Sequence, residues 1–129
     1  METNLSGAFY CSKEALARFK IRGGGYIINI GSLAGKNAFA GGAAYNASKF
    51  GALGFTHALR EDLRKRGIRV LALLPGATST DIWSQFWPGA PREKMISAEA
   101  VAQAVLHAVS APANTAIEEI RIGPASGVL

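Results

Sequence analysis

A chain of 129 residues is long enough for one hydrophobic core and therefore for one domain. Its composition, 49% hydrophobic and 18% charged with 15 glycines, is that of a globular protein and excludes a disordered or fibrous chain. The net charge is +5, but only the segment 64–69 (RKRGIR) is locally basic. That segment is either the solvated end of a helix or a phosphate-binding patch.

Cysteine usage and hydropathy narrow the class of protein further. Cys11 is the only cysteine, which excludes an internal disulfide and a cysteine metal cluster, and the two histidines lack the spacing of metal ligands. No apolar run approaches the roughly 18–20 residues of a membrane span, and no signal-peptide pattern is present. We therefore expect a cytoplasmic protein with no metal site that binds neither a membrane nor nucleic acid.

The first half of the chain alternates between helix and strand. Residues 4–20 carry apolar side chains at helical spacing, and three glycines at 23–25 end this helix. The β-branched run 26–32 (YIINIGS) then predicts a short buried strand.

The second half continues the alternation. A long helix is predicted over 43–66, followed by a buried strand over 68–76 that a Pro-Gly pair closes. After a polar loop, Ser97 is the expected N-cap of a helix over 98–109, and residues 116–123 predict a third strand.

Uninterrupted apolar strands alternating with helices indicate an α/β fold, with a parallel sheet covered on both faces. Right-handed crossovers would place the three strands side by side in chain order. Three strands make a thin sheet, and one edge of the strand at 26–32 would normally lie against another strand. We therefore expect residues 1–129 to form a single partial domain, a Rossmann-like doubly wound parallel sheet that lacks its N-terminal βαβ half.

Tyr45 and Lys49 stand four residues apart in the segment 43–55 (AAYNASKFGALGF). On a helix, this spacing places both side chains on one face, about 6 Å apart along the axis. An ammonium group so placed favours the phenolate, as proton transfer near neutral pH requires. The same spacing also arises by chance, so the pair alone leaves both interpretations open.

Ser32 ends the predicted strand 26–32, thirteen residues before Tyr45, where the strand ends of a doubly wound sheet form a ligand crevice. Its hydroxyl could bind a substrate oxygen while Tyr45 gives or takes a proton, or it could simply cap the following turn. The helix around Tyr45 contains interior glycines, each costing about 1 kcal/mol against alanine. Their repetition predicts close packing against a cofactor, a strand or a second subunit.

Taken in order, N-I-G-S at 29–32, Y-N-A-S-K at 45–49 and P-G-A-T-S-T at 75–80 resemble the motifs of the short-chain dehydrogenase/reductase family. The similarity extends from NLSGAF at 4–9 to IRIGPASG at 120–127, and so over essentially the whole chain. This resemblance implies an oxidoreductase that interconverts a carbonyl and an alcohol with NAD or NADP as its cofactor.

The resemblance also assigns catalytic roles to four residues. It implies that Tyr45 is the catalytic acid or base and that Lys49 assists it while binding the nicotinamide ribose. It implies that Ser32 holds the oxygen of the substrate, a small-molecule carbonyl or alcohol. Asn4 matches an asparagine that anchors a proton-relay water in the family, although it could equally be a simple N-cap.

Further along, Pro75 and Gly76 match the family's turn beside the nicotinamide. The backbone of Thr78 and the side chain of Thr80 match positions that bind the carboxamide and the pyrophosphate, or are merely polar loop residues. The place of the substrate lid is taken by an aromatic loop, which could instead form a packing or subunit contact and contains Trp83, Phe86 and Trp87.

The family's glycine-rich turn, its N-N-A-G strand and the residue that selects NAD or NADP do not occur in this sequence. The glycines at 23–25 stand between a helix and a strand, which is the wrong context for a phosphate-binding turn. We therefore expect the C-terminal half of such an enzyme, with weak or no activity alone. It would form a homo-oligomer through the helices that contain Asn4 and Tyr45. The alternative is a non-catalytic fragment that acts as an assembly module.

Overall fold

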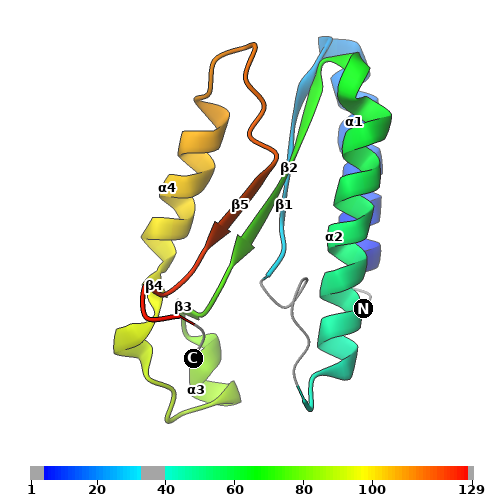
Figure 1. Ribbon diagram of the computed structural model, residues 1–129. Helices are drawn as coiled ribbons and strands as arrows, with labels where there is room; N and C mark the ends of the chain where they lie inside the picture. Colours follow the sequence, from blue (N-terminus) through cyan, green and yellow to red (C-terminus); the bar gives the residue numbers. More distant parts are fainter. Residues whose placement is uncertain (1–4, 33–39, 128–129) are drawn as a thin grey trace.

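The computed structural model describes residues 5–32 and 40–127 of the chain (Figure 1). Helices and strands alternate along it, as the hydropathy pattern predicts. In chain order the elements are α1 (Gly7–Arg22), β1 (Gly25–Ile30), α2 (Ala43–Leu63), the 3-10 turn η3 (Arg64–Arg66), β2 (Ile68–Pro75), β3 (Thr78–Ser79), α3 (Ile82–Phe86), the 3-10 turn η4 (Arg92–Lys94), β4 (Ile96–Ser97), α4 (Ala98–Val109) and β5 (Glu119–Ile122).

The main sheet has three parallel strands in the order β1-β2-β5. The register pairs Gly25 with Ile68 at the start of β1 and Ala72 with Glu119 at the start of β5. This confirms the predicted parallel sheet with its strands side by side in chain order. A second, two-residue parallel ladder joins β3 to β4.

Helices lie on both sides of the sheet, with α1 and α2 on one side and α4 on the other (Figure 1). Side chains of β1 form hydrogen bonds to the helices on both sides of the sheet. The Asn29 side-chain amide donates to Thr56 Oγ1 of α2 over 3.0 Å, and the Tyr26 hydroxyl donates to the Ala108 carbonyl of α4 over 3.2 Å. The prediction of a partial Rossmann-like α/β fold with flanking helices is therefore confirmed.

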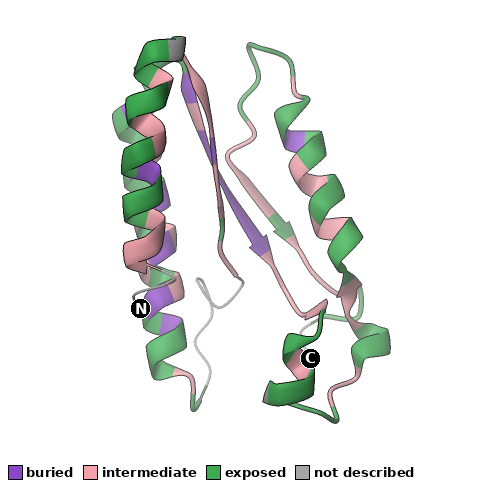
Figure 2. Cartoon of the chain, turned by 180° about the vertical axis from the view of Figure 1, so that it is seen from behind, coloured by how far each residue is buried: buried purple, intermediate pink, exposed green. Residues whose placement is uncertain are grey.

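The hydrophobic core is concentrated on β2, the central strand, and on the side of α2 that faces the sheet (Figure 2). Leu71 and Leu73 are completely buried. One core cluster joins β1, α2 and β2 through Ile27, Leu59, Leu63, Ile68 and Val70. A strand with neighbours on both edges and helices over both faces has little room for polar side chains, which explains the buried apolar run from Val70 to Leu74 in β2. Arg69 is the exception, and its guanidinium donates to the Tyr26 hydroxyl over 3.1 Å.

Gly23 and Gly25, between α1 and β1, are required for different physical reasons. Gly23 has φ = 87°, and its N–H donates to the Phe19 carbonyl over 2.8 Å, which ends α1. At Gly25, an added Cβ would lie 2.6 Å from the Phe19 ring, so only glycine admits this close approach. The long helix predicted over 43–66 ends as an α-helix at Leu63, and η3 completes it before Gly67 at φ = 71°.

The other predicted boundaries shift by a few residues. Ser97 is the N-cap of α4, as expected, because its hydroxyl accepts from the Ala100 N–H over 3.1 Å. The first strand ends at Ile30, although the Gly31 N–H still donates to the Leu73 carbonyl over 2.7 Å. The third strand is shorter than the predicted 116–123, because the β2–β5 register begins only at Glu119.

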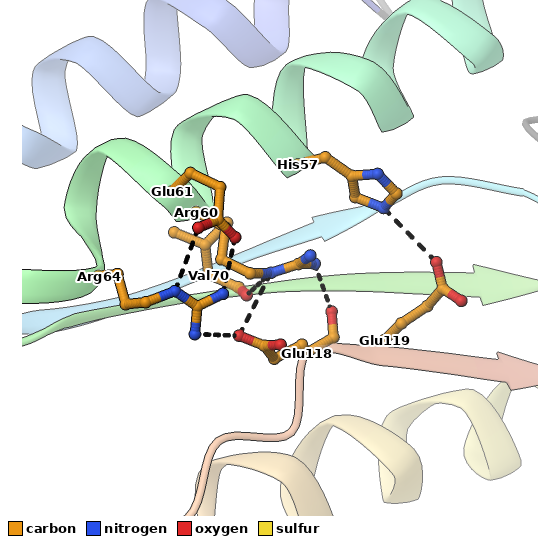
Figure 3. A network of polar contacts seen from close by, with 7 residues as sticks. All are labelled: His57, Arg60, Glu61, Arg64, Val70, Glu118 and Glu119. Atoms are coloured by element: carbon orange, nitrogen blue, oxygen red, sulfur yellow. Dashed lines mark hydrogen bonds and ion pairs between the residues drawn. The ribbon is translucent and has the colours of Figure 1, made fainter.

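Arg60 of α2 contacts the end of the sheet where β5 begins (Figure 3). Its guanidinium donates to the Val70 carbonyl over 3.1 Å and to the Glu118 carbonyl over 2.6 Å. Val70 lies two residues before the first register pair between β2 and β5. Arg60 therefore donates to carbonyl groups just before the pairing of β2 with β5 begins, and its side chain is only 13% exposed.

Exposed ion pairs surround this arginine. Arg64 contacts Glu118 Oε2 at 2.8 Å and Glu61 Oε1 at 2.7 Å, and the hydrogen bond from Arg64 lowers the pKa of the Glu61 carboxyl. His57 Nε2 lies 3.6 Å from Glu119 Oε1. The basic segment 64–69 thus begins as an exposed helical turn at the end of α2, as the first of its two interpretations predicts.

Replacing Arg60 by methionine is expected to lower the free energy of unfolding by about 2–3 kcal/mol, because two carbonyls lose a charged donor while the apolar stem is kept. Urea unfolding followed by circular dichroism measures the change. Arg64→Met is the matched control and should shift the midpoint clearly less, because its ion pairs are exposed to solvent. Equal shifts in the two variants would contradict the role assigned to Arg60.

Candidate active site

The predicted site residues that the structure describes lie toward the carboxyl end of the sheet. The arrowheads of β2 and β5 point toward the end where β3 and α3 lie, and α2 begins at the same end (Figure 1). Crevices at this edge of an open α/β sheet are where such folds bind ligands.

Tyr45 and Lys49 lie on the first two turns of α2. Lys49 Nζ is 5.6 Å from the centroid of the Tyr45 ring, a cation–π arrangement, so the i,i+4 spacing does bring the two side chains together. Tyr45 is 45% exposed, whereas Asn46 and Ser48 beside it are buried. The helix therefore presents the tyrosine to solvent from a backbone that is fixed on its other side.

Ser48 is part of that fixed side. Its hydroxyl donates to the carbonyl of Tyr45 over 2.8 Å. Sequence reasoning gave Ser48 no role, although a serine inside a helix commonly bonds back to a carbonyl three or four residues earlier. That general tendency was the signal that could have found it.

Ser32 follows β1 by two residues and is half-buried. The hydrogen bond from Gly31 to Leu73 holds the backbone immediately before it against β2. Ser32 and Tyr45 therefore stand at the same end of the sheet, one after β1 and the other at the start of α2. Asn4 lies outside the described residues, so the structure tests neither interpretation of its role.

The turn after β2 is fixed by backbone hydrogen bonds. The Gly76 N–H donates to the Ile122 carbonyl of β5 over 2.7 Å, and Pro75 pairs in register with the same residue. The Thr78 hydroxyl donates to the Gly76 carbonyl over 3.0 Å, while Thr80 is exposed. A ligand at this turn would meet an ordered backbone.

Trp83 holds the aromatic segment, the predicted substrate lid, against this turn. The indole N–H of Trp83 donates to the Thr78 carbonyl over 2.7 Å, and its ring meets the Trp87 ring edge-on with centroids 6.2 Å apart. Trp87 is 45% exposed. The side chain of Phe86 lies outside the described part of the structure. Sequence reasoning missed the bond to Thr78, which the need of a part-buried indole for an acceptor could have suggested.

The predicted close packing at the glycines of α2 is found at Gly51, but against a different partner. An added Cβ there would lie 3.2 Å from Leu5, at the chain entering α1. The expectation of a cofactor, strand or second subunit was therefore wrong at this position. An added Cβ at Gly54 would meet no described atom within 4 Å.

The described residues offer neither a metal site nor a membrane-spanning helix. No group of three or more histidine, cysteine or acidic side chains is placed to hold a metal ion there. Nor is any described helix long and apolar enough to cross a membrane.

Comparison with known proteins identifies the family. The model of the short chain dehydrogenase family matches residues 1–90, more than half of the chain. The chain belongs to the short-chain dehydrogenase family. The resemblance seen in the motifs is thereby confirmed.

Curated relatives of this short-chain dehydrogenase include a sepiapterin reductase of Chlorobaculum tepidum, 33% identical over 98% of this chain and 52% of the relative. An uncharacterized oxidoreductase of Staphylococcus haemolyticus is 27% identical over 96% of this chain and 53% of its own length. The chain thus spans about half the length of the curated relatives it matches.

Solved structures agree with the fold of this short-chain dehydrogenase. The closed form of a serine dehydrogenase complexed with NADP+ superposes with a TM-score of 0.87 at 30% identity, covering 99% of this chain and 55% of the other. An actinorhodin polyketide ketoreductase with NADPH gives 0.74 at 30% identity, covering 92% of this chain and 54% of that chain. These similar structures contain nicotinamide cofactors and again match over about half their length.

Proposed function

We propose that this chain carries the proton-transfer residues of an NAD(P)-dependent oxidoreductase that interconverts a small-molecule carbonyl and an alcohol. One observation carries the proposal: Lys49 Nζ lies 5.6 Å from the ring of an exposed tyrosine, Tyr45, at the ligand-binding end of the sheet. A tyrosine buried in the core would have no access to substrate.

In the reducing direction, the Tyr45 hydroxyl donates its proton to the carbonyl oxygen of the substrate. Lys49 stabilises the phenolate that this transfer leaves, because a nearby positive charge favours the ionised form. Ser32 donates a hydrogen bond to the same oxygen and so orients the carbonyl. A nicotinamide cofactor, when bound, would supply the hydride that completes the reduction to the alcohol.

The residues present fit the nicotinamide half of the cofactor. Lys49 supplies a cation that can bind ribose hydroxyls, and the fastened turn offers the backbone of Pro75, Gly76 and Thr78 together with the exposed side chain of Thr80. We assign these residues to the cofactor, whether NAD or NADP, and Asn4 to the proton relay. The aromatic segment, Trp83 with Phe86 and Trp87, is assigned to the substrate lid.

Cofactor binding tests this proposal. Titration of the 129-residue chain with NADH and NADPH, followed by nicotinamide fluorescence, is expected to give saturable binding, tighter when the N-terminal half of a relative is supplied. Lys49→Met should raise the dissociation constant by about tenfold through loss of a charge-assisted contact. Lys65→Met, in η3 at the opposite end of α2, is the matched control. An absence of saturable binding in both preparations would overturn the proposal.

A non-catalytic assembly role has its own observation in favour. Phe9, Tyr10 and Phe50 are between 44% and 64% exposed on α1 and α2, the helices through which we propose homo-oligomers form. Sedimentation velocity measures the assembly. A chain that assembles through these helices but shows no saturable cofactor binding would be the assembly module.

A further inference from the structure

A cavity lies at the end of the molecule away from Tyr45. Its volume is about 440 Å³, and it lies between the C-terminal half of α1 and the junction where α2 passes through η3 into β2. Tyr45 and Leu63 mark the two ends of α2, about 27 Å apart along the helix axis. The cavity is therefore separate from the candidate active site.

The floor of this cavity is apolar. Leu63 and Ile68 are buried members of the main core cluster, and Leu16 and Phe19 pack against that cluster from α1. The cavity thus lies directly beside the main core cluster.

Three cations stand around this floor, and no carboxylate lines it. They are Lys13, Lys20 and Arg66. Within the described part of the chain, none of the three has an ion pair or a side-chain hydrogen bond, whereas the neighbouring Arg64 binds two carboxylates. The positive charge at the rim is therefore available to a ligand.

The spacing on α1 makes this arrangement a continuous strip. Lys13, Leu16, Ala17 and Lys20 follow at the i, i+3, i+4, i+7 positions that share one helix face. The two lysines lie about 10 Å apart along the axis, with the apolar side chains between them. Arg66 faces this strip from η3 across the cavity.

We propose that the cavity binds a medium-chain aliphatic carboxylate. Its volume lies within the range of small-molecule sites, its floor can take an alkyl chain, and its rim offers cations for one carboxylate group. Charge complementarity selects the anion, because a cationic amphiphile of the same chain length would face three positive charges and no acid.

Lys20 and Arg66 also stand near helix C-termini, where cations offset the helix dipole. This structural role and ligand binding predict different results. Loss of a dipole contact lowers the melting temperature of the free protein, whereas loss of a binding contact lowers the affinity for the ligand. Both quantities are therefore measured for every variant.

Isothermal titration of the full 129-residue chain with dodecanoate, kept below its micelle concentration, is expected to show saturable binding to one site. Dodecyltrimethylammonium, with the same chain length and the opposite charge, should not bind. The double variant Lys20→Glu/Arg66→Glu should weaken dodecanoate by at least about tenfold. Ala17→Trp, at an exposed position of the lining, should block it by filling the cavity. Lys94→Glu, remote from the cavity, should leave the affinity unchanged.

Three results would overturn the proposal. The first is equal binding of the cationic amphiphile, which would mean simple detergent adsorption. The second is unchanged dodecanoate affinity in both the double variant and Ala17→Trp. The third is a loss of oligomer mass in Ala17→Trp by light scattering without any loss of dodecanoate affinity, which would assign the cavity to a second copy of this chain.

Discussion

Tyr45→Phe is expected to lower kcat for carbonyl reduction by about 10²- to 10⁴-fold, the usual contribution of a positioned general acid. The substitution removes only the hydroxyl group. The ring that lies 5.6 Å from Lys49 Nζ stays, and because Tyr45 is 45% exposed, no buried polar group is lost. Steady-state rates with NADH and NADPH measure the effect in whichever preparation turns over, the chain alone or the chain with a relative's N-terminal half.

Tyr10→Phe is the matched control for this prediction. Tyr10 lies on α1, is 64% exposed and loses the same single oxygen. We expect it to leave kcat unchanged, and we expect both variants to keep the melting temperature of the parent chain within a degree or two, as surface changes usually do. A Tyr45→Phe variant with full kcat would remove Tyr45 from the proposed proton transfer.

The strands of the main sheet can be predicted from the sequence because each follows a local hydropathy pattern. The buried apolar run Val70–Leu74 of β2 follows from its neighbours on both edges and helices on both faces, and the order of its parallel partners follows from the handedness of helical crossovers. The ladder between β3 and β4 is different. A pairing of Thr78 and Ser79 with residues near 96 is too short to carry a period and depends on how the loop folds back.

The same distinction separates the parts of the candidate site. The contact between Tyr45 and Lys49 follows from helix geometry alone and is predictable from their spacing. The anchoring of Trp83 on the Thr78 carbonyl is tertiary, and nothing in the residue order fixes it. Ser32 and Tyr45, thirteen positions apart in the sequence, both stand at one end of the sheet, but how they lie relative to each other depends on how β1 and α2 pack.

Arg60 shows why hydropathy patterns do not predict hydrogen bonds between distant elements. In the sequence it belongs to an ordinary charged helix end, next to Glu61 and Asp62. Only the folded chain brings it to the Val70 and Glu118 carbonyls, because the register between β2 and β5 begins two residues after Val70. Such a role depends on where a distant strand starts, and that boundary is the least predictable feature of a strand.

Leu73→Ala is expected to have the largest effect on stability, lowering the free energy of unfolding by about 3–5 kcal/mol. Leu73 is completely buried on the central strand, in register with Ile30 of β1 and Ile120 of β5. Neighbours on both edges limit how far the structure can collapse into the space that the missing methyl groups leave, so the cavity penalty adds to the lost burial. Urea unfolding followed by circular dichroism gives the change from the shift in midpoint at constant slope.

Leu106→Ala removes the same atoms from α4, where the side chain is 65% exposed, and should change the free energy of unfolding by less than about 0.5 kcal/mol. Equal losses in the two variants would mean that the buried surface of β2 is not what holds the sheet together. Leu73→Ala also separates folding from chemistry, because the carbonyl that accepts the Gly31 N–H belongs to the backbone and is retained. At temperatures where the variant is still folded, kcat should therefore stay near that of the parent, whereas Tyr45→Phe should lose kcat and keep its midpoint. The opposed responses of these two variants would show that proton transfer and sheet stability rest on different residues of the same fold.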